Sequence, residues 1–148
     1  MGDKKLKLLY LAKYLEEETD QEHPAGMPEL LAYLTANGIS AERKSVYDDL
    51  RLLESFGMDI ETVKGRQFGY YLGERTFQLP EVKLLVDAVQ ASKVVSARTS
   101  SKLIHKLEAL CSDYEGTQLQ RQVYVDGRPK SDSHTLLYSI DALHSAIN

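Results

Sequence analysis

The fold is decided by the stretch Ser40-Ala41-Glu42-Arg43-Lys44-Ser45-Val46-Tyr47-Asp48-Asp49-Leu50-Arg51-Leu52-Leu53-Glu54-Ser55-Phe56-Gly57. It predicts one amphipathic helix, in which Ser40 accepts hydrogen bonds from the first free amides and Gly57 takes the left-handed conformation that ends the helix. The face that we expect to be buried has helical spacing and consists of Val46, Asp49, Leu50 and Leu53. The opposite face carries Lys44, Tyr47, Asp48 and Arg51.

Two further helices are expected before this stretch. The first covers 4–18, and the second begins near Pro28, a favoured first-turn residue, and ends at Asn37-Gly38. Their buried stripes are expected to be Leu8, Leu9, Ala12 and Leu15 in the first helix and Leu30, Leu31 and Leu34 in the second. Only a short turn separates the end of the second helix from Ser40, so the second and third helices must cross at a steep angle, as in a helix-turn-helix. Ile39 is expected to fill the corner between them.

After Gly57 the apolar period becomes alternating, which predicts a β-hairpin around the turn 64–67. The expected register pairs Thr62 with Phe68, Ile60 with Tyr70 and Met58 with Leu72, because these pairs place all their side chains on one face. The tip of the hairpin then presents Lys64 and Arg66 to solvent. Three helices followed by such a hairpin predict a winged helix-turn-helix over 1–77.

The second half, 78–148, is expected to be a helical linker and dimerisation region, which makes the fold class mainly α with a small β-hairpin. Helices are predicted from Pro80 to Ser96, from a cap at Thr99 to Ser112, and from Thr135 to Ile147. A polar break is expected at 112–118 and a short strand at 122–125. The first of these helices is apolar over an arc that needs partners on two sides, so we expect a homodimer held chiefly by Leu85 and Val89.

Composition limits the class of protein. The 148 residues suffice for one ordinary domain or two small ones, and the charged and apolar fractions are those of a soluble globular protein. No apolar run approaches the roughly 20 residues that span a bilayer, and no signal-peptide core is present, so a cytoplasmic protein without a membrane partner is expected. The single Cys111 fits a reducing compartment and lies in an apolar stripe typical of a core.

The formal net charge of −4 is unusual for a nucleic-acid binder, but five acidic residues form one run from Glu16 to Glu22, away from the elements expected to contact DNA. In a winged helix the third helix enters the major groove and the wing lies along the backbone. We therefore expect contacts with double-stranded DNA from Arg43, Lys44, Ser45, Tyr47, Arg51, Lys64 and Arg66. The simpler alternative is a solvated helix face with a Lys44–Asp48 ion pair worth about 0.2–0.5 kcal/mol.

Motifs for catalysis are lacking from the sequence, which has no P-loop, nucleophile elbow or zinc-finger spacing. His134, Asp141 and His144 can share one arc of the last helix, but metal ligands normally show tighter spacing and come from converging elements. The sequence therefore predicts no enzyme activity, no cofactor and no resident metal.

Several segments resemble bacterial WYL-domain transcriptional regulators, which carry a DeoR-like winged helix-turn-helix. In order along the chain, they are Arg43-Lys44-Ser45-Val46-Tyr47-Asp48-Asp49-Leu50, Asp59-Ile60, Gly69-Tyr70-Tyr71-Leu72, Arg75-Thr76-Phe77, Leu84-Leu85-Val86-Asp87-Ala88-Val89, Ser101-Lys102-Leu103-Ile104-His105-Lys106-Leu107 and Ser139-Ile140-Asp141-Ala142-Leu143-His144-Ser145-Ala146-Ile147. The resemblance implies a transcriptional regulator in which a winged helix is followed by helices that lead into a ligand-sensing domain.

The chain departs from that family in having no Trp, and hence no Trp-Tyr-Leu segment. It ends at Asn148, where the family's sensing domain would begin, so the effector domain is expected to be missing. The leading hypothesis is a sequence-specific DNA-binding regulator. The alternative is a winged-helix module that docks on proteins without binding DNA, which the negative net charge favours. The sequence does not identify the operator, the effector, the regulated genes or the sign of regulation.

Overall fold

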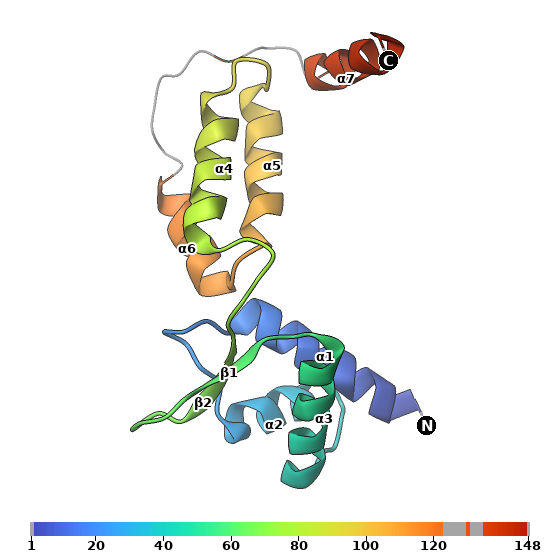
Figure 1. The fold of residues 1–148 in the computed structure, drawn as a ribbon, viewed down its shortest axis with the longest axis vertical. Coiled ribbons are helices and arrows are strands. Elements are labelled where there is room, and N and C mark those ends of the chain that lie inside the picture. Colours follow the sequence, from blue (N-terminus) through green and yellow to red (C-terminus); the bar gives the residue numbers. More distant parts are fainter. Residues whose placement is uncertain (1, 123–129, 131–134, 148) are drawn as a thin grey trace. The chain divides into compact units, whose positions relative to one another are not determined.

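The computed structural model describes residues 2–122, 130 and 135–147 and divides the chain into two compact units. The first unit consists of Met1–Thr76 and Cys111–Tyr114, and the second of Phe77–Leu110 and Glu115–Asn148. The described ranges contain seven helices and one two-stranded antiparallel sheet (Figure 1). The predicted fold class, mainly α with a small β-hairpin, is therefore confirmed.

The first unit has three helices followed by a hairpin. Its elements are α1 (Gly2–Glu18), α2 (Met27–Ala36), α3 (Arg43–Phe56), β1 (Ile60–Val63) and β2 (Gly69–Leu72). The turn between α2 and α3 contains Gly38 at a φ of 76°, a left-handed value that glycine adopts without a Cβ clash. This order of elements is the one expected for a winged helix-turn-helix, with α3 as the helix that follows the turn.

A single hydrophobic core lies where the three helices and the hairpin meet. Its fully or almost fully buried members are Leu11, Leu15, Ala25, Met27, Leu30, Leu34, Ile39, Val46, Leu50, Leu53, Ile60 and Leu72. The burial expected for Leu30 and Leu34 in α2, for Val46, Leu50 and Leu53 in α3 and for Ile39 is thus confirmed, whereas Leu31 and Asp49 are only half-buried. The stripe expected for α1 is wrong at one position, because Leu9 is 65% exposed and Leu11 is fully buried. Position 11 continues the helical spacing between 8 and 15, and position 9 lies outside it.

The two ends of α3 are closed differently. The N-cap is Glu42, which makes no side-chain cap hydrogen bond, so the predicted cap at Ser40 is wrong. At the other end Gly57 adopts a φ of 114°, as predicted. The Gly57 amide donates to Glu54 O and the Met58 amide to Leu53 O, both at 3.0 Å. These bonds satisfy carbonyls that the end of a helix leaves without a partner.

The hairpin register differs from the prediction by two residues. Ile60 pairs with Leu72 and Thr62 with Tyr70, so Phe68 lies in the loop instead of the strand. The predicted pairing used Met58, but the amide of that residue closes the end of α3. Because side chains alternate along a strand, a shift by two keeps every residue on its expected face, and Ile60 and Leu72 still enter the core.

The loop after α1 and the segment after β2 hold the hairpin in place. Ala25 and Tyr70 exchange both backbone hydrogen bonds, at 2.7 and 2.8 Å. Thr19 Oγ1 donates to Leu15 O at 2.6 Å and accepts from the Leu72 amide at 3.1 Å. The Arg75 guanidinium donates to the carbonyls of Glu16 and Thr19, both at 2.8 Å, where a cation is favoured by the helix dipole.

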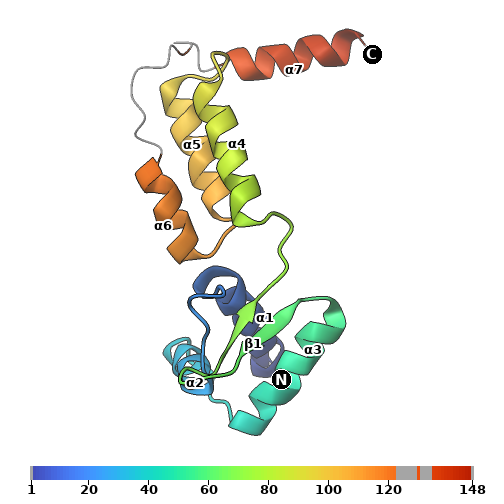
Figure 2. The same ribbon diagram turned by 60° about the vertical axis from the view of Figure 1, so that its left-hand side comes forward.

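The second unit contains α4 (Leu79–Ala91), α5 (Ala97–Glu108), most of α6 (Asp113–Gln122) and α7 (Leu136–Ile147) (Figure 2). The two helices α4 and α5 pack against each other side by side. α4 begins with a capping interaction in which the Gln78 amide donates to Glu81 Oε2 at 2.8 Å. Its buried side chains are Val82 and Val86, whereas α7 has no buried residue.

Several predicted boundaries in the second half are wrong. α4 ends at Ala91, and α5 is capped by Ser96, whose Oγ accepts from the Thr99 amide at 3.2 Å. The segment 112–118, which was expected to be a polar break, lies mostly in α6. Ser112 precedes this helix and Glu115 lies in its first turn, which is the spacing of a capping box. The expected strand is wrong at Gln122, which ends α6, and its remainder, 123–125, lies outside the described residues.

Candidate nucleic-acid interface

The outer face of α3 is exposed to solvent, as predicted, and carries Lys44, Tyr47, Asp48 and Arg51. Arg51 Nη1 lies 3.5 Å from Asp48 Oδ1, and the two side chains are 77% and 60% exposed. The ion pair that the structure shows on this face joins Asp48 and Arg51, not Lys44 and Asp48 as in the alternative of a solvated helix face. Because so exposed a pair contributes little to stability, Arg51 can exchange Asp48 for another acceptor at small cost.

The hairpin, called the wing below, presents cations and aromatic rings. Lys64 and Arg66 are exposed in the loop between β1 and β2, as predicted. Phe68 is 51% exposed, and its ring meets that of Tyr70 edge-on, with 5.5 Å between centroids and an interplanar angle of 83°. Burial, followed by the charge of Tyr47 and a hydrogen bond with it, raises the pKa of Tyr70. The rings of Phe68 and Tyr70 thus lie together on the wing.

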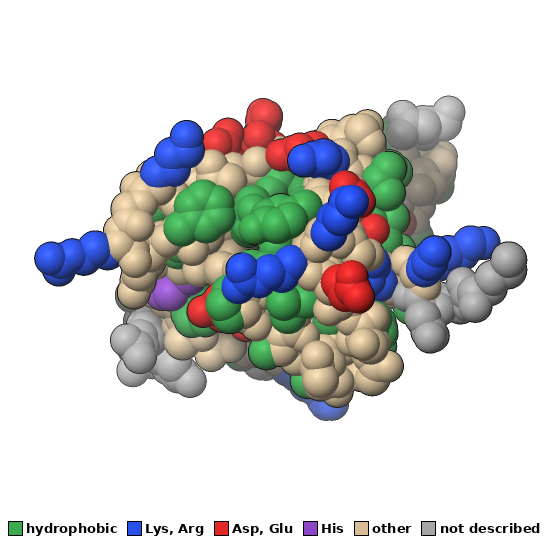
Figure 3. All heavy atoms as spheres, turned by 90° about the horizontal axis from the view of Figure 1, so that it is seen from below, with side chains coloured by type: hydrophobic (Ala, Val, Ile, Leu, Met, Phe, Trp, Pro, Cys, Tyr) green, Lys and Arg blue, Asp and Glu red, His purple; other side chains and the backbone are tan. Residues whose placement is uncertain are grey.

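Charge is mixed over the end of the first unit seen in Figure 3. Separate Lys and Arg side chains surround hydrophobic side chains, and Asp and Glu side chains lie among them (Figure 3). This pattern differs from the continuous basic patch of a protein that binds nucleic acid by charge alone. Recognition at such a face depends on individual polar and aromatic groups.

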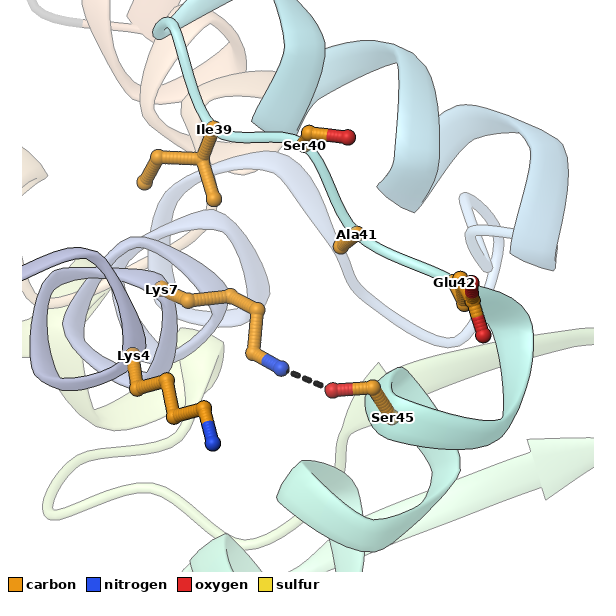
Figure 4. Close-up of a pocket in the computed structure, with 7 residues that line it drawn as sticks. All are labelled: Lys4, Lys7, Ile39, Ser40, Ala41, Glu42 and Ser45. Carbon is orange, nitrogen blue, oxygen red and sulfur yellow. Dashed lines mark hydrogen bonds between the residues drawn. The ribbon is translucent and has the colours of Figure 1, made fainter. Parts of the chain in front are cut away.

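The N-terminal end of α3 borders a hollow of about 240 Å³ (Figure 4). Its lining comes from α1, from the turn before α3 and from α3 itself, and consists of Lys4, Lys7, Ile39, Ser40, Ala41, Glu42 and Ser45. Ser45 is half-buried and accepts a hydrogen bond from Lys7 Nζ, whereas Arg43 is exposed. The structure thus keeps Arg43 on the surface and turns Ser45 toward α1.

An ion pair that the sequence analysis missed joins α1 to α3. Lys7 Nζ lies 2.7 Å from Asp49 Oδ2, and the two side chains are only 8% and 13% exposed. A buried charge needs a partner of opposite sign, so the two residues depend on each other. The sequence held only half of the signal, because Asp49 falls on the apolar stripe of α3 but no local pattern connects it with Lys7. The pair anchors α3 from its inner side.

A second missed cluster surrounds Asp20. The Ser112 hydroxyl donates to Asp20 Oδ2 at 2.5 Å, and His23 Nδ1 lies 2.8 Å from Asp20 Oδ1. The pKa of Asp20 is lowered because the hydrogen bonds from Ser112 and His23 outweigh the opposing effect of burial. His23 also stacks on Tyr114, with ring centroids 3.8 Å apart. Since the carboxylate separates the hydroxyl from the imidazole, the arrangement does not form a nucleophile–base pair, and it ties Cys111–Tyr114 into the first unit.

The residues expected at a dimer interface lie on α4. Leu85 and Val89 are half-buried, and the neighbouring Leu84 is 69% exposed. Cys111 is buried and fits the expected core position. The described ranges contain no group of three His, Cys, Asp or Glu side chains that could hold a metal ion, and His134 lies outside them.

In the part of the chain that the structure describes, no helix has both the length and the apolar character needed to cross a membrane. No protein-family model matches the chain, and no curated protein or solved structure was found to match it. The function of the chain is therefore inferred from the fold of the first unit and from the side chains that it exposes.

Proposed function

We propose that the chain is a sequence-specific DNA-binding transcriptional regulator that inserts α3 into the major groove. The observation that supports this most strongly is the division of α3 into two faces. Val46, Leu50 and Leu53 fix one face in the core, and the opposite face holds Lys44, Tyr47 and Arg51 in solvent. A helix anchored on one side and polar on the other is the form in which winged helices present side chains to base edges.

The roles of the exposed side chains follow from their chemistry. Arg51 has a planar donor pair that suits guanine O6 and N7, and its partner Asp48 is weakly held. Lys44 and Arg43 supply phosphate contacts near the start of α3, and Lys64 and Arg66 supply them from the wing. The net charge of −4 lowers non-specific affinity, which is mostly electrostatic, so base contacts account for a larger share of recognition.

Selection from a pool of random double-stranded oligonucleotides tests the proposal. The full chain, immobilised at roughly physiological salt, is expected to enrich one short motif over successive rounds. The selected duplex should then bind more tightly than a shuffled duplex of the same composition. A pool that remains random after repeated rounds, or a motif that binds no better than its shuffled control, would contradict the proposal.

We also propose that the regulator acts as a homodimer through α4. The supporting observation is the apolar surface that this helix leaves in solvent, with Leu84 exposed and Leu85 and Val89 half-buried. Two copies related by a two-fold axis would read half-sites about one helical turn, ~34 Å, apart or a multiple of it. Sedimentation equilibrium should report a dimer at micromolar concentration that Leu85→Lys or Val89→Lys dissociates while the first unit stays folded. A monomer at all concentrations, or a dimer indifferent to both changes, would overturn this interface.

One observation favours a second function, which is docking on another protein. Leu52 and Phe56 are 55% and 84% exposed at a spacing that places them on one edge of α3. DNA recognition by Lys44 and Arg51 does not use this apolar edge. If random selection yields no motif, this edge is the surface to examine. We further propose that the chain is related to WYL-domain regulators, that it has no enzyme activity and that it is cytoplasmic.

A further inference from the structure

The segment Cys111–Tyr114 belongs to the first unit, although it lies in sequence between α5 and the remainder of α6, which belong to the second. We propose that this segment controls the wing through a chain of hydrogen bonds that runs from Ser112 through the loop after α1 to the Leu72 amide. A rearrangement of α5 or α6 then alters DNA binding without a change on the exposed face of α3. The effect on DNA rests on the proposed function, whereas the link to the wing can be measured without DNA.

The segment is held in the first unit by the buried Asp20 carboxylate. The fully buried Ser112 hydroxyl donates to Asp20 Oδ2 at 2.5 Å. Asp20 Oδ1 accepts from the amides of Glu22 and His23 at 3.0 and 2.9 Å, which fixes the carboxylate within a tight turn. Because hydrogen bonds to ionised groups are about twice as strong as those between neutral groups, Ser112 and Asp20 are expected to move together.

Thr19, the residue before Asp20, holds the end of the wing. It is fully buried, its hydroxyl accepts from the Leu72 amide at 3.1 Å, and its carbonyl accepts from Arg75 Nη2 at 2.8 Å. Leu72 is the last residue of β2. Since Thr19 and Asp20 share one planar peptide unit, a shift of Asp20 carries Thr19 with it. The end of the wing is therefore bound to the same loop that binds the segment.

These two attachments to one loop couple the segment and the wing in free energy. A displacement of the segment that breaks the bond to Asp20 removes a constraint from Thr19, so the end of β2 opens more often. Such coupling is reciprocal, so DNA held by the wing also favours the bound position of the segment. A change within α5 or α6 reaches the wing through the covalent chain and this loop.

Hydrogen exchange of the Leu72 amide in Ser112→Ala tests the link. Exchange should become roughly tenfold faster or more, because the loop that protects this amide has lost a charged hydrogen bond. The Ile39 amide, which donates to Leu34 O at 2.9 Å in the turn before α3, reports the general stability of the first unit. Its exchange should accelerate clearly less than that of Leu72. Equal acceleration of the two amides would show a general loss of stability and overturn the link.

A matched control is Gln120→Ala. Gln120 Nε2 donates to Glu108 Oε2 at 3.0 Å and so joins α6 to α5 outside the segment. This variant should leave the exchange of the Leu72 amide unchanged, and an acceleration equal to that in Ser112→Ala would contradict the route through Asp20. Ser112→Cys keeps the shape of the buried site with a weaker donor. It should give a smaller acceleration in the same direction, and it takes the place of Ser112→Ala if that variant does not fold.

Affinity for the selected duplex tests the consequence for DNA. Ser112→Ala should weaken binding by about threefold or more, but by less than about twofold when Lys64→Ala and Arg66→Ala are already present, because the wing then has few contacts left to lose. Equal weakening in both backgrounds would mean that the segment does not act through the wing. A chain that selects no duplex would refute the proposed function, and the exchange of the Leu72 amide would still decide whether the segment and the wing are linked.

Discussion

Helices α3 and α7 both have apolar residues at helical spacing, but only one of them buries these residues within the chain. α3 places Val46, Leu50 and Leu53 in the core of the first unit. α7 has no buried residue, and Leu143 and Ile147 are 62% and 80% exposed. Apolar periodicity therefore identifies the face of a helix that avoids water, but it does not identify what covers that face.

Truncation of one leucine in each helix gives the largest expected difference. Leu50→Ala should lower the free energy of unfolding by about 2–5 kcal/mol, because Leu50 is 4% exposed and its removal leaves a cavity. Leu143→Ala should change it by less than about 0.5 kcal/mol, as expected for a surface position. Urea unfolding followed by circular dichroism at low protein concentration measures both. A cost of about 2 kcal/mol for Leu143→Ala would show that α7 is covered in solution.

A smaller effect on the free energy of unfolding is expected at the segment Cys111–Tyr114, which belongs to the first unit. Ser112→Ala removes a hydrogen bond to the buried Asp20 carboxylate and should cost about 1.5–3 kcal/mol at pH 7. The folded-state pKa of Asp20 is lowered, so its stabilising contribution is complete above the unfolded pKa of about 3.9 and is lost as pH falls through the folded value. The difference between variant and unaltered chain should therefore shrink below about pH 4. A difference that is constant from pH 7 to pH 3 would contradict this role.

The smallest effect is expected in the salt dependence of DNA affinity, when cations of the wing are compared with exposed cations of the second unit. Lys64→Ala together with Arg66→Ala should reduce the slope of log affinity against log salt by about 1.8, because each phosphate contact contributes about 0.9. The control is Arg98→Ala with Lys102→Ala, two exposed cations of α5 that should leave the slope unchanged. Fluorescence anisotropy of the selected duplex over a salt series provides the slopes. An equal reduction in both double variants would mean that the wing has no special role.

The sequence was sufficient to predict elements that local chemistry determines. Gly57 marks the end of α3, and the apolar spacing of Val46, Leu50 and Leu53 identifies its buried face. The helix start was misplaced because Ser40 is a favoured capping residue, whereas the chain remains extended as far as Glu42. The hairpin register was misjudged because the Met58 amide is used by the end of α3, a constraint that strand alternation does not contain.

Features that depend on partners distant in sequence were not predictable in the same way. Lys7 looked like one of several surface lysines, and only the packing of α1 on α3 brings it to Asp49. Asp20 and Ser112 are separated by 92 positions, and no local pattern connects them. The exposed residues of the candidate interface were predictable because exposure follows from the apolar face opposite.

Whether α3 and the wing bind DNA is decided by the affinity of the Lys44→Ala/Arg51→Ala double variant for the selected duplex. Both side chains are exposed, so the variant should unfold like the unaltered chain. Loss of a base-reading Arg51 alone should cost about 1–3 kcal/mol of binding free energy and relax the base preference at one position. The double variant should form a complex at least tenfold weaker, whereas Arg98→Ala/Lys102→Ala should bind as tightly as the unaltered chain. Full affinity and unchanged base preference in the Lys44→Ala/Arg51→Ala variant would contradict it.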